Sequence, residues 1–131
     1  MNKIVEALRE TGIFYVSTVE DDQPKVRPFG AVMDLHGTAY FCTNNTKDVY
    51  RQLIKNPKTQ ICGCRKDGGW VRVTGKLIRD DSDAARAAML EALPGLKRMY
   101  SVGDGIFEVF RLEQASALLY SRGAAPVEIE E

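Results

Sequence analysis

The sequence has 131 residues, which suits one domain with a sizeable hydrophobic core and is too short for two ordinary domains. Lysine and arginine together number 18, as do aspartate and glutamate, so the net charge at pH 7 is zero. This balance argues against a general nucleic-acid or membrane-surface binder, which would carry a basic excess, and it makes self-association plausible.

The cysteines are odd in number, and the N-terminus lacks the apolar segment of a secretory signal, as is typical of proteins from a reducing compartment. No apolar run approaches the roughly 20 residues that a bilayer span needs. We therefore expect a soluble cytoplasmic protein with no membrane partner and no nucleic-acid partner.

The first half of the chain predicts one helix followed by three strands. Helical spacing of apolar residues, then a glycine, indicates the helix, and β-branched and aromatic residues indicate the strands. Asp21 to Pro24 and His36-Gly37 are typical of turns, and the second and third strands should form a β-meander. The expected elements are a helix over 2–11 and strands over 13–19, 25–34 and 38–43.

The second half alternates between helical and strand patterns. A helix over 46–55, with Asn45 or Thr46 as its N-cap, should end before Asn56-Pro57, and another should end at Pro94-Gly95. Strands are expected over 58–64, 70–78, 106–112 and 115–120, the last two as separate strands or as one bent strand. Six or seven antiparallel strands with short helices between them favour a small closed or partly closed barrel, built as one domain over residues 1–131. Residues 122–131 should form a flexible or lightly docked tail.

Four small polar residues and a lysine lie at the strand-to-helix corner of residues 43–47. The free N–H groups of a helix N-terminus attract anions, and Lys47 adds a full charge while Thr43 and Thr46 add hydroxyl donors. The corner could therefore bind a phosphate. Taken alone, the corner is better explained as a plain N-cap beside a solvated lysine, because polar N-caps are the rule.

The strand over 25–34 favours the phosphate interpretation. Proline at position 28 lacks the N–H that a strand ladder needs, so it suits a sheet edge or a ligand-facing position. Arg27 shares a strand face with apolar residues and needs an anionic partner there. That partner could be a carboxylate of the protein, or the same phosphate that Lys47 would contact.

Two segments carry a family resemblance: PKVRPFGAVMDLHGTAYFCTNNTKDVYRQLIKNPKTQICG, from residue 24, and GGWVRVTGKL, from residue 68. Their order and spacing resemble the FMN-binding split β-barrel proteins of the pyridoxamine 5′-phosphate oxidase-like superfamily, and most closely its short nitroimidazole-reductase-like (Nim-type) group. The resemblance covers residues 1 to about 121. It implies a mainly β split barrel with six or seven antiparallel strands and short peripheral helices, assembled as a homodimer with FMN in grooves at the subunit interface.

The resemblance also implies site residues. The strand at Val26 to Gly30 would line the isoalloxazine ring, the corner would hold the ribityl phosphate, and Trp70 would come close to the cofactor or the dimer seam. Residues from the 66–70 turn and the 94–105 segment of the second subunit would complete the pocket. The expected cofactor-binding residues are Val26, Arg27, Pro28, Phe29, Cys42, Thr43, Asn44, Asn45, Lys47 and Trp70.

The expected function is an FMN-dependent oxidoreductase acting on an unknown small molecule, with NAD(P)H as a possible electron donor. A flavin carrier without turnover and a deazaflavin-dependent reductase are the alternatives. The acidic ending of the chain argues against oxidation of pyridoxamine phosphate, which in this family uses basic C-terminal residues. His36, in a turn, is given no catalytic role. The Cys62-Gly-Cys64 pair lacks further metal ligands and is expected to be buried and structural.

Overall fold

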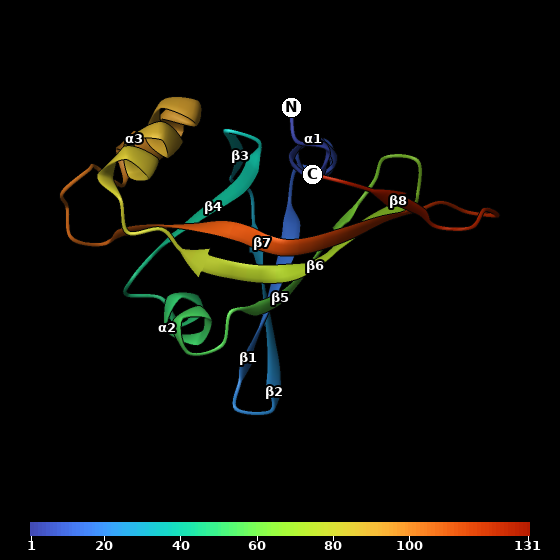
Figure 1. The fold of residues 1–131 in the computed structure, drawn as a ribbon, viewed down its shortest axis with the longest axis horizontal. Coiled ribbons are helices and arrows are strands. Elements are labelled where there is room, and N and C mark those ends of the chain that lie inside the picture. Colours follow the sequence, from blue (N-terminus) through green and yellow to red (C-terminus); the bar gives the residue numbers. More distant parts are fainter.

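The computed structural model describes residues 1–131 and contains one antiparallel sheet of eight strands with short helices around it (Figure 1). No helix is both long and apolar enough to cross a membrane. The helices are α1 (Lys3–Thr11), α2 (Asp48–Lys55), α3 (Asp83–Ala92) and the 3-10 helix η1 (Pro94–Arg98). The strands are β1 (Phe14–Glu20), β2 (Gln23–Phe29), β3 (Val32–Leu35), β4 (Thr38–Asn44), β5 (Lys58–Cys64), β6 (Trp70–Arg79), β7 (Phe107–Tyr120) and β8 (Val127–Ile129).

The sheet curls until its two edges meet. The strand order is β2-β1-β5-β6-β7-β4-β3, with β8 added on β7. The strands at the two ends, β2 and β3, are joined only by Gly30 and Ala31. Since consecutive Cα atoms are about 3.8 Å apart, Phe29 and Val32 lie within roughly 11 Å of each other. This confirms the predicted mainly β, barrel-like fold, with an opening between the two edge strands.

The single strand predicted over 25–34 is wrong, because the chain breaks at Gly30 and changes partners there. β2 pairs with β1, whereas β3 pairs with β4, so only β3 and β4 form the predicted hairpin. The first turn is also shorter than predicted, since Gln23 and Pro24 already belong to β2. Because β2 ends the strand order, Pro24 and Pro28 lie on an edge strand, where a missing N–H is tolerated.

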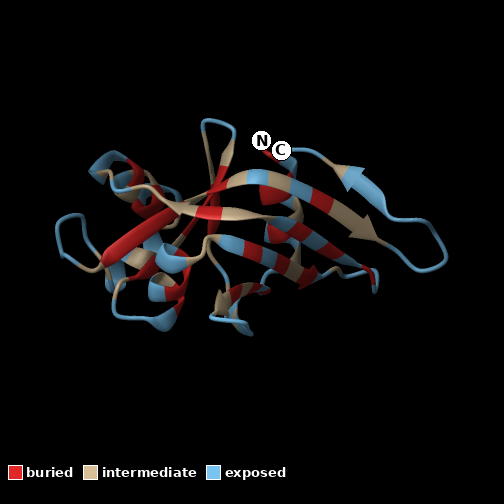
Figure 2. Cartoon of the chain, turned by 60° about the horizontal axis from the view of Figure 1, so that its bottom comes forward, coloured by how far each residue is buried: buried red, intermediate tan, exposed pale blue.

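Two clusters of buried apolar residues hold the fold together. Figure 2 marks the buried residues along the chain in red. The larger one fills the inside of the curled sheet and includes Phe14, Phe41 and Phe110, with α1 and α2 packed against it. The smaller one joins α3 to β3, β4 and β7 through residues such as Met89 and Val109. The predicted first helix is confirmed, and the Asn2 side chain caps it by accepting hydrogen bonds from the first-turn N–H groups.

The C-terminal part of the sheet is one long strand. β7 spans the two segments predicted over 106–112 and 115–120, and its pairing with β6 shifts register near Gly75. β8 then docks on β7. The Glu131 carboxylate accepts a hydrogen bond of 2.8 Å from the Asn2 side chain, so the tail is docked through β8 and through its last residue.

Candidate functional site

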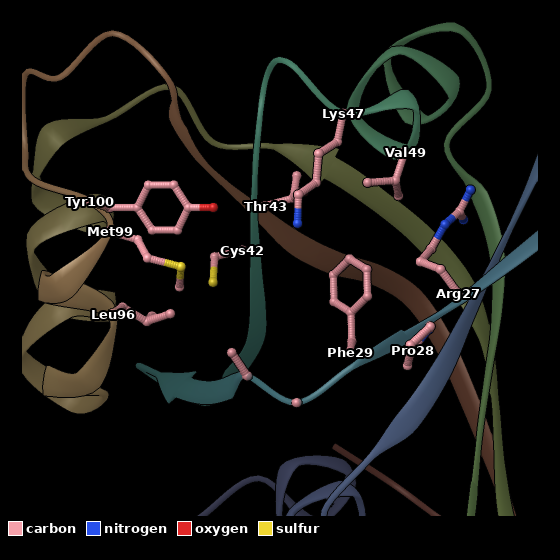
Figure 3. A pocket seen from close by; sticks show the side chains of 12 residues that line it. Arg27, Pro28, Phe29, Cys42, Thr43, Lys47, Val49, Leu96, Met99 and Tyr100 are labelled. Carbon is pink, nitrogen blue, oxygen red and sulfur yellow. The ribbon is translucent and has the colours of Figure 1, made fainter.

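A cavity of about 210 Å³ lies where the two sheet edges meet and is covered on one side by η1 (Figure 3). Its walls come from β2, the Gly30-Ala31 break, β4, the start of α2, and the segment around η1. Arginine and lysine line it, and no carboxylate does. The lining residues are Arg27, Pro28, Phe29, Gly30, Ala31, Cys42, Thr43, Lys47, Val49, Leu96, Met99 and Tyr100.

Arg27 forms no salt bridge with a carboxylate of the chain. Its guanidinium donates hydrogen bonds of 2.8 Å to the Thr18 hydroxyl and 2.6 Å to the Gln52 side-chain oxygen, and a third to a backbone carbonyl. All three acceptors are neutral. Burial lowers the pKa of Arg27, and the nearby Asp48 offsets part of this effect. The intramolecular salt bridge that the sequence left open is therefore not formed, and the charge is available to an anion.

Lys47 faces the same cavity from the start of α2 (Figure 3). The predicted helix start at residue 46 is wrong by two residues, since α2 begins at Asp48. The Asn44 side-chain oxygen accepts hydrogen bonds from the backbone N–H and the hydroxyl of Thr46, and these bonds hold residues 44–46 in a turn. Lys47 becomes the N-cap, and its side chain makes no capping hydrogen bond. The lysine is thus free to extend over the cavity, next to helix donors that no side chain caps.

Thr43 is the one residue with a buried side-chain polar atom that has no hydrogen-bond partner. It is 5% exposed and lies on β4 between the cationic residues and the η1 side of the cavity (Figure 3). An unsatisfied buried hydroxyl costs about 1–3 kcal/mol, so such groups are rare and point to a missing partner. A bound oxyanion at this end of the cavity would supply that partner.

The opposite wall of the cavity was not identified among the predicted site residues. Leu96, Met99 and Tyr100 line it from η1 and the residue pair that follows, in the same chain. The family resemblance instead predicts that the 94–105 segment comes from the second subunit. Its loop residues follow no periodic pattern, and only the fold brings them opposite β2. The cavity therefore has a cationic side and a side rich in apolar and aromatic groups.

Three of the predicted cofactor-binding residues do not line the cavity of their own chain. The Asn44 side-chain NH2 group donates a hydrogen bond of 2.8 Å to the Tyr100 hydroxyl, and the Asn44 side-chain oxygen accepts one from Thr46. Both polar atoms of the Asn44 side chain therefore have partners within the chain. The Asn45 amide turns away from the cavity to Gly105 and Glu108. Trp70 stacks on Tyr120 at the far end of β6. Their predicted contacts with a cofactor stay predictions, with Asn44 and Asn45 shaping the corner in the structure.

The remaining predicted residues lie at or beside the cavity. Pro28 and Phe29 line it, and Val26 precedes them in β2 with its side chain 67% exposed.

His36 is exposed in the predicted turn. The prediction that Cys62 and Cys64 are buried is wrong, because both point to the outer face of β5: Cys62 is half-buried and Cys64 is exposed.

Cys42 lines the cavity, but its thiol is expected to be inert. Burial raises the pKa of Cys42 to about 12, and the nearby Lys47 only partly opposes this effect. At about pH 8 the thiol therefore stays protonated, and only the thiolate reacts with iodoacetamide. We expect mass spectrometry of the native protein to find alkylation at the exposed Cys64 and none at Cys42. Unfolding in urea should expose all three thiols, and modification of Cys42 in the folded protein would contradict the prediction.

The arrangement can hold a molecule with an anionic group at one end and an apolar, planar body. Arg27 and Lys47 supply two positive charges that form no salt bridge, and the Thr43 hydroxyl supplies a group without a partner. Phe29, Leu96 and Met99 supply apolar surface. A flavin mononucleotide has this chemistry, since its phosphate is dianionic and its ring system is flat.

Comparisons with known proteins agree with this geometry. A family profile described as pyridoxamine 5′-phosphate oxidase matches residues 1–117. A NimC/NimA family protein from Clostridium acetobutylicum is 43% identical, with a TM-score of 0.96 over 100% of this chain and 92% of that one. No curated protein sequence matches.

Two more distant structures share the fold. One is a pyridoxamine 5′-phosphate oxidase-related, FMN binding protein from Nostoc punctiforme, 19% identical, with a TM-score of 0.66 over 98% of this chain and 95% of that one. The other is a heme binding protein from Mycobacterium smegmatis, 19% identical, with a TM-score of 0.75 over 96% of this chain and 57% of that one. At this level of identity they support the architecture alone.

Proposed function

Since the chain belongs to the pyridoxamine 5′-phosphate oxidase family, and within it to the NimC/NimA group, we propose that it is an FMN-binding oxidoreductase. The observation that carries the proposal is that two cationic side chains without a salt bridge and one hydroxyl without a hydrogen-bond partner line a single cavity. Arg27 and Lys47 have no carboxylate partner there, and the Thr43 hydroxyl has no partner of any kind. These residues would hold the phosphate of FMN.

The protein's own residues would bind and orient the cofactor. Phe29 and the backbone at Pro28 and Gly30 would contact the ring, and the wall around η1 would exclude water from part of it. FMN, when bound, supplies hydride or single-electron transfer to a small molecule. The cavity wall formed by Leu96, Met99 and Tyr100 suits an uncharged organic substrate, with the Tyr100 hydroxyl as a hydrogen-bonding group.

We propose further that the working unit is a homodimer. The cavity of about 210 Å³ is smaller than the roughly 300–1,000 Å³ typical of sites for small organic ligands, so one chain supplies only part of such a site. Apolar side chains are exposed around its mouth. They are Val26 in β2, Met99 in the cavity wall, Tyr15 opposite Pro28, and Ile13, whose Cδ1 lies 3.6 Å from where a Gly30 Cβ would be. A second copy covering these residues would complete the groove and bring its own residues, Trp70 among them, toward the ring.

The proposal is tested by adding FMN to the purified apo-protein. We expect stoichiometric binding, with quenching of flavin fluorescence and a visible flavin spectrum, and light scattering is expected to give the mass of two chains. A protein that takes up no FMN would contradict the cofactor assignment, and a persistent monomer with FMN bound would contradict the dimer. Reduction of the bound flavin by NADH or NADPH in a stopped-flow instrument would separate a reductase from a flavin carrier.

The deazaflavin alternative is tested in the same titration. A bound deazaflavin absorbs at shorter wavelength than FMN, so competition between the two cofactors is followed directly by absorbance. Tighter binding of the deazaflavin would replace FMN in the proposal and leave the phosphate-binding residues unchanged. The expected cytoplasmic location stays a prediction.

A further inference from the structure

A partly buried cluster of charged residues lies beside the 43–47 corner, and none of its members lines the cavity. Its centre is Glu108 on β7, which pairs with Thr43 across the β4–β7 ladder and has a side chain only 4% exposed. The Glu108 carboxylate accepts hydrogen bonds of 3.0 Å from the Arg79 Nε, 3.0 Å from Arg86 and 3.0 Å from the Asn45 amide. The carboxylate is therefore both neutralised by two arginines and tied to the corner.

This cluster makes two contacts, one with the corner and one with the helix that follows it. The first is Asn45, whose backbone N–H donates to Ile106 and whose side chain donates to both Gly105 and Glu108. The second is Arg79, whose guanidinium lies over the ring of Tyr50, 5.8 Å from its centre, in the first turns of α2. Lys47 lies between these two points, at the end of the corner and the start of the helix.

We propose that Glu108 is a positioning residue for the cofactor phosphate: it fixes the 43–47 corner through Asn45 and thereby sets the preference for a phosphorylated flavin over riboflavin. The inference rests on the proposed binding of FMN and adds a residue that does not line the cavity. Burial raises the pKa of the Glu108 carboxyl, but hydrogen bonds from Arg79, Asn45 and Arg86 outweigh burial and leave the pKa below its usual value. The carboxylate thus stays charged and keeps all three partners in place.

Whether removal of the Glu108 charge strengthens or weakens phosphate binding distinguishes a positioning role from a purely electrostatic one. Removing a negative charge close to a phosphate site should strengthen phosphate binding if Glu108 acted only through its field. If it acts by holding the corner, the same substitution should weaken phosphate binding. A general loss of stability would weaken FMN and riboflavin binding alike, because the two ligands differ only in the phosphate.

The test compares the dissociation constants of FMN and riboflavin, measured by flavin fluorescence, in the full-length wild type and in Glu108→Gln, Asn45→Ala and Glu113→Gln. Glu113→Gln is the matched control, since it removes a carboxylate of the same strand that pairs with Arg111 on the surface. We expect Glu108→Gln and Asn45→Ala each to weaken FMN binding about tenfold, the loss of roughly one hydrogen bond to a charged group, with riboflavin binding within about twofold of the wild type. The control should change neither.

Three results of these titrations would contradict the positioning role of Glu108. Equal or tighter FMN binding by Glu108→Gln, or equal losses for FMN and riboflavin, would overturn the inference while leaving the proposed function intact. Absence of FMN binding by the wild type would overturn the proposed function and the inference together. If Glu108→Gln fails to fold, Asn45→Ala decides, because it cuts the link to the corner and leaves the ion pairs of Glu108 with Arg79 and Arg86 in place.

Discussion

Replacing either Arg27 or Lys47 by alanine is expected to weaken FMN binding by about 1–3 kcal/mol, the usual scale of a hydrogen bond between a charged donor and an anion. The two side chains reach the cavity from different elements, β2 and the residue before α2. The hydrogen-bond partners of Arg27 are neutral, and Lys47 makes no capping bond, so each charge is available to the phosphate. Titration with FMN, followed by fluorescence quenching, measures the loss.

The two substitutions should differ in their effect on the apo-protein. Arg27 holds Thr18 and Gln52, which are 1% and 3% exposed, so Arg27→Ala removes buried hydrogen bonds and should lower the free energy of unfolding by about 1–3 kcal/mol. Lys47 is exposed, and its loss should change the free energy of unfolding by less than about 0.5 kcal/mol. Thermal unfolding without flavin measures both values.

A conservative variant separates charge from geometry at position 27. Arg27→Lys keeps the positive charge but loses the planar fork that reaches Thr18 and Gln52 together. It should bind FMN more tightly than Arg27→Ala and more weakly than the wild type. Unchanged FMN affinity in both alanine variants would mean that the phosphate is held elsewhere in the protein.

The strand-to-helix corner and the Arg27-Pro28 strand could be identified from sequence because their signals are local. A proline next to an arginine in a strand is unusual wherever it occurs, and four small polar residues before a lysine mark a turn into a helix. The break at Gly30 could not be predicted in this way. It depends on β2 and β3 joining opposite edges of the same sheet, which is a property of the whole topology.

Long-range contacts also explain the site residues whose positions differ from the prediction. The sequence predicts that Asn44 and Asn45 face a phosphate because both precede the helix. In the structure their amides instead contact Tyr100 and Glu108, which are more than 50 residues away in the sequence. The cavity wall at Leu96 and Met99 likewise exists only because η1 folds back over the opening between the sheet edges. Local composition carries no information on any of these pairings.

Thr43→Val is expected to make the apo-protein more stable and the FMN complex weaker. Valine has nearly the shape of threonine and lacks the hydroxyl, which in Thr43 is buried without a partner. Its removal should raise the free energy of unfolding by up to about 1–3 kcal/mol, the cost of an unsatisfied buried polar group. It should also weaken FMN binding by a similar amount, since a hydrogen bond to a charged phosphate is lost. Denaturant unfolding without flavin and FMN titration measure the two effects.

Thr59→Val is the matched control, because it makes the same substitution at a residue of the same 5% exposure. The Thr59 hydroxyl donates a hydrogen bond of 2.7 Å to the Ser17 carbonyl, so its loss should destabilise the protein and leave FMN affinity unchanged. Opposite signs for the two valines would show that Thr43 retains a locally unfavourable hydroxyl for its ligand, as functional sites often do at a cost in stability. If Thr43→Val instead destabilised the apo-protein as Thr59→Val does, the Thr43 hydroxyl would have a partner within the chain and would not be reserved for the phosphate.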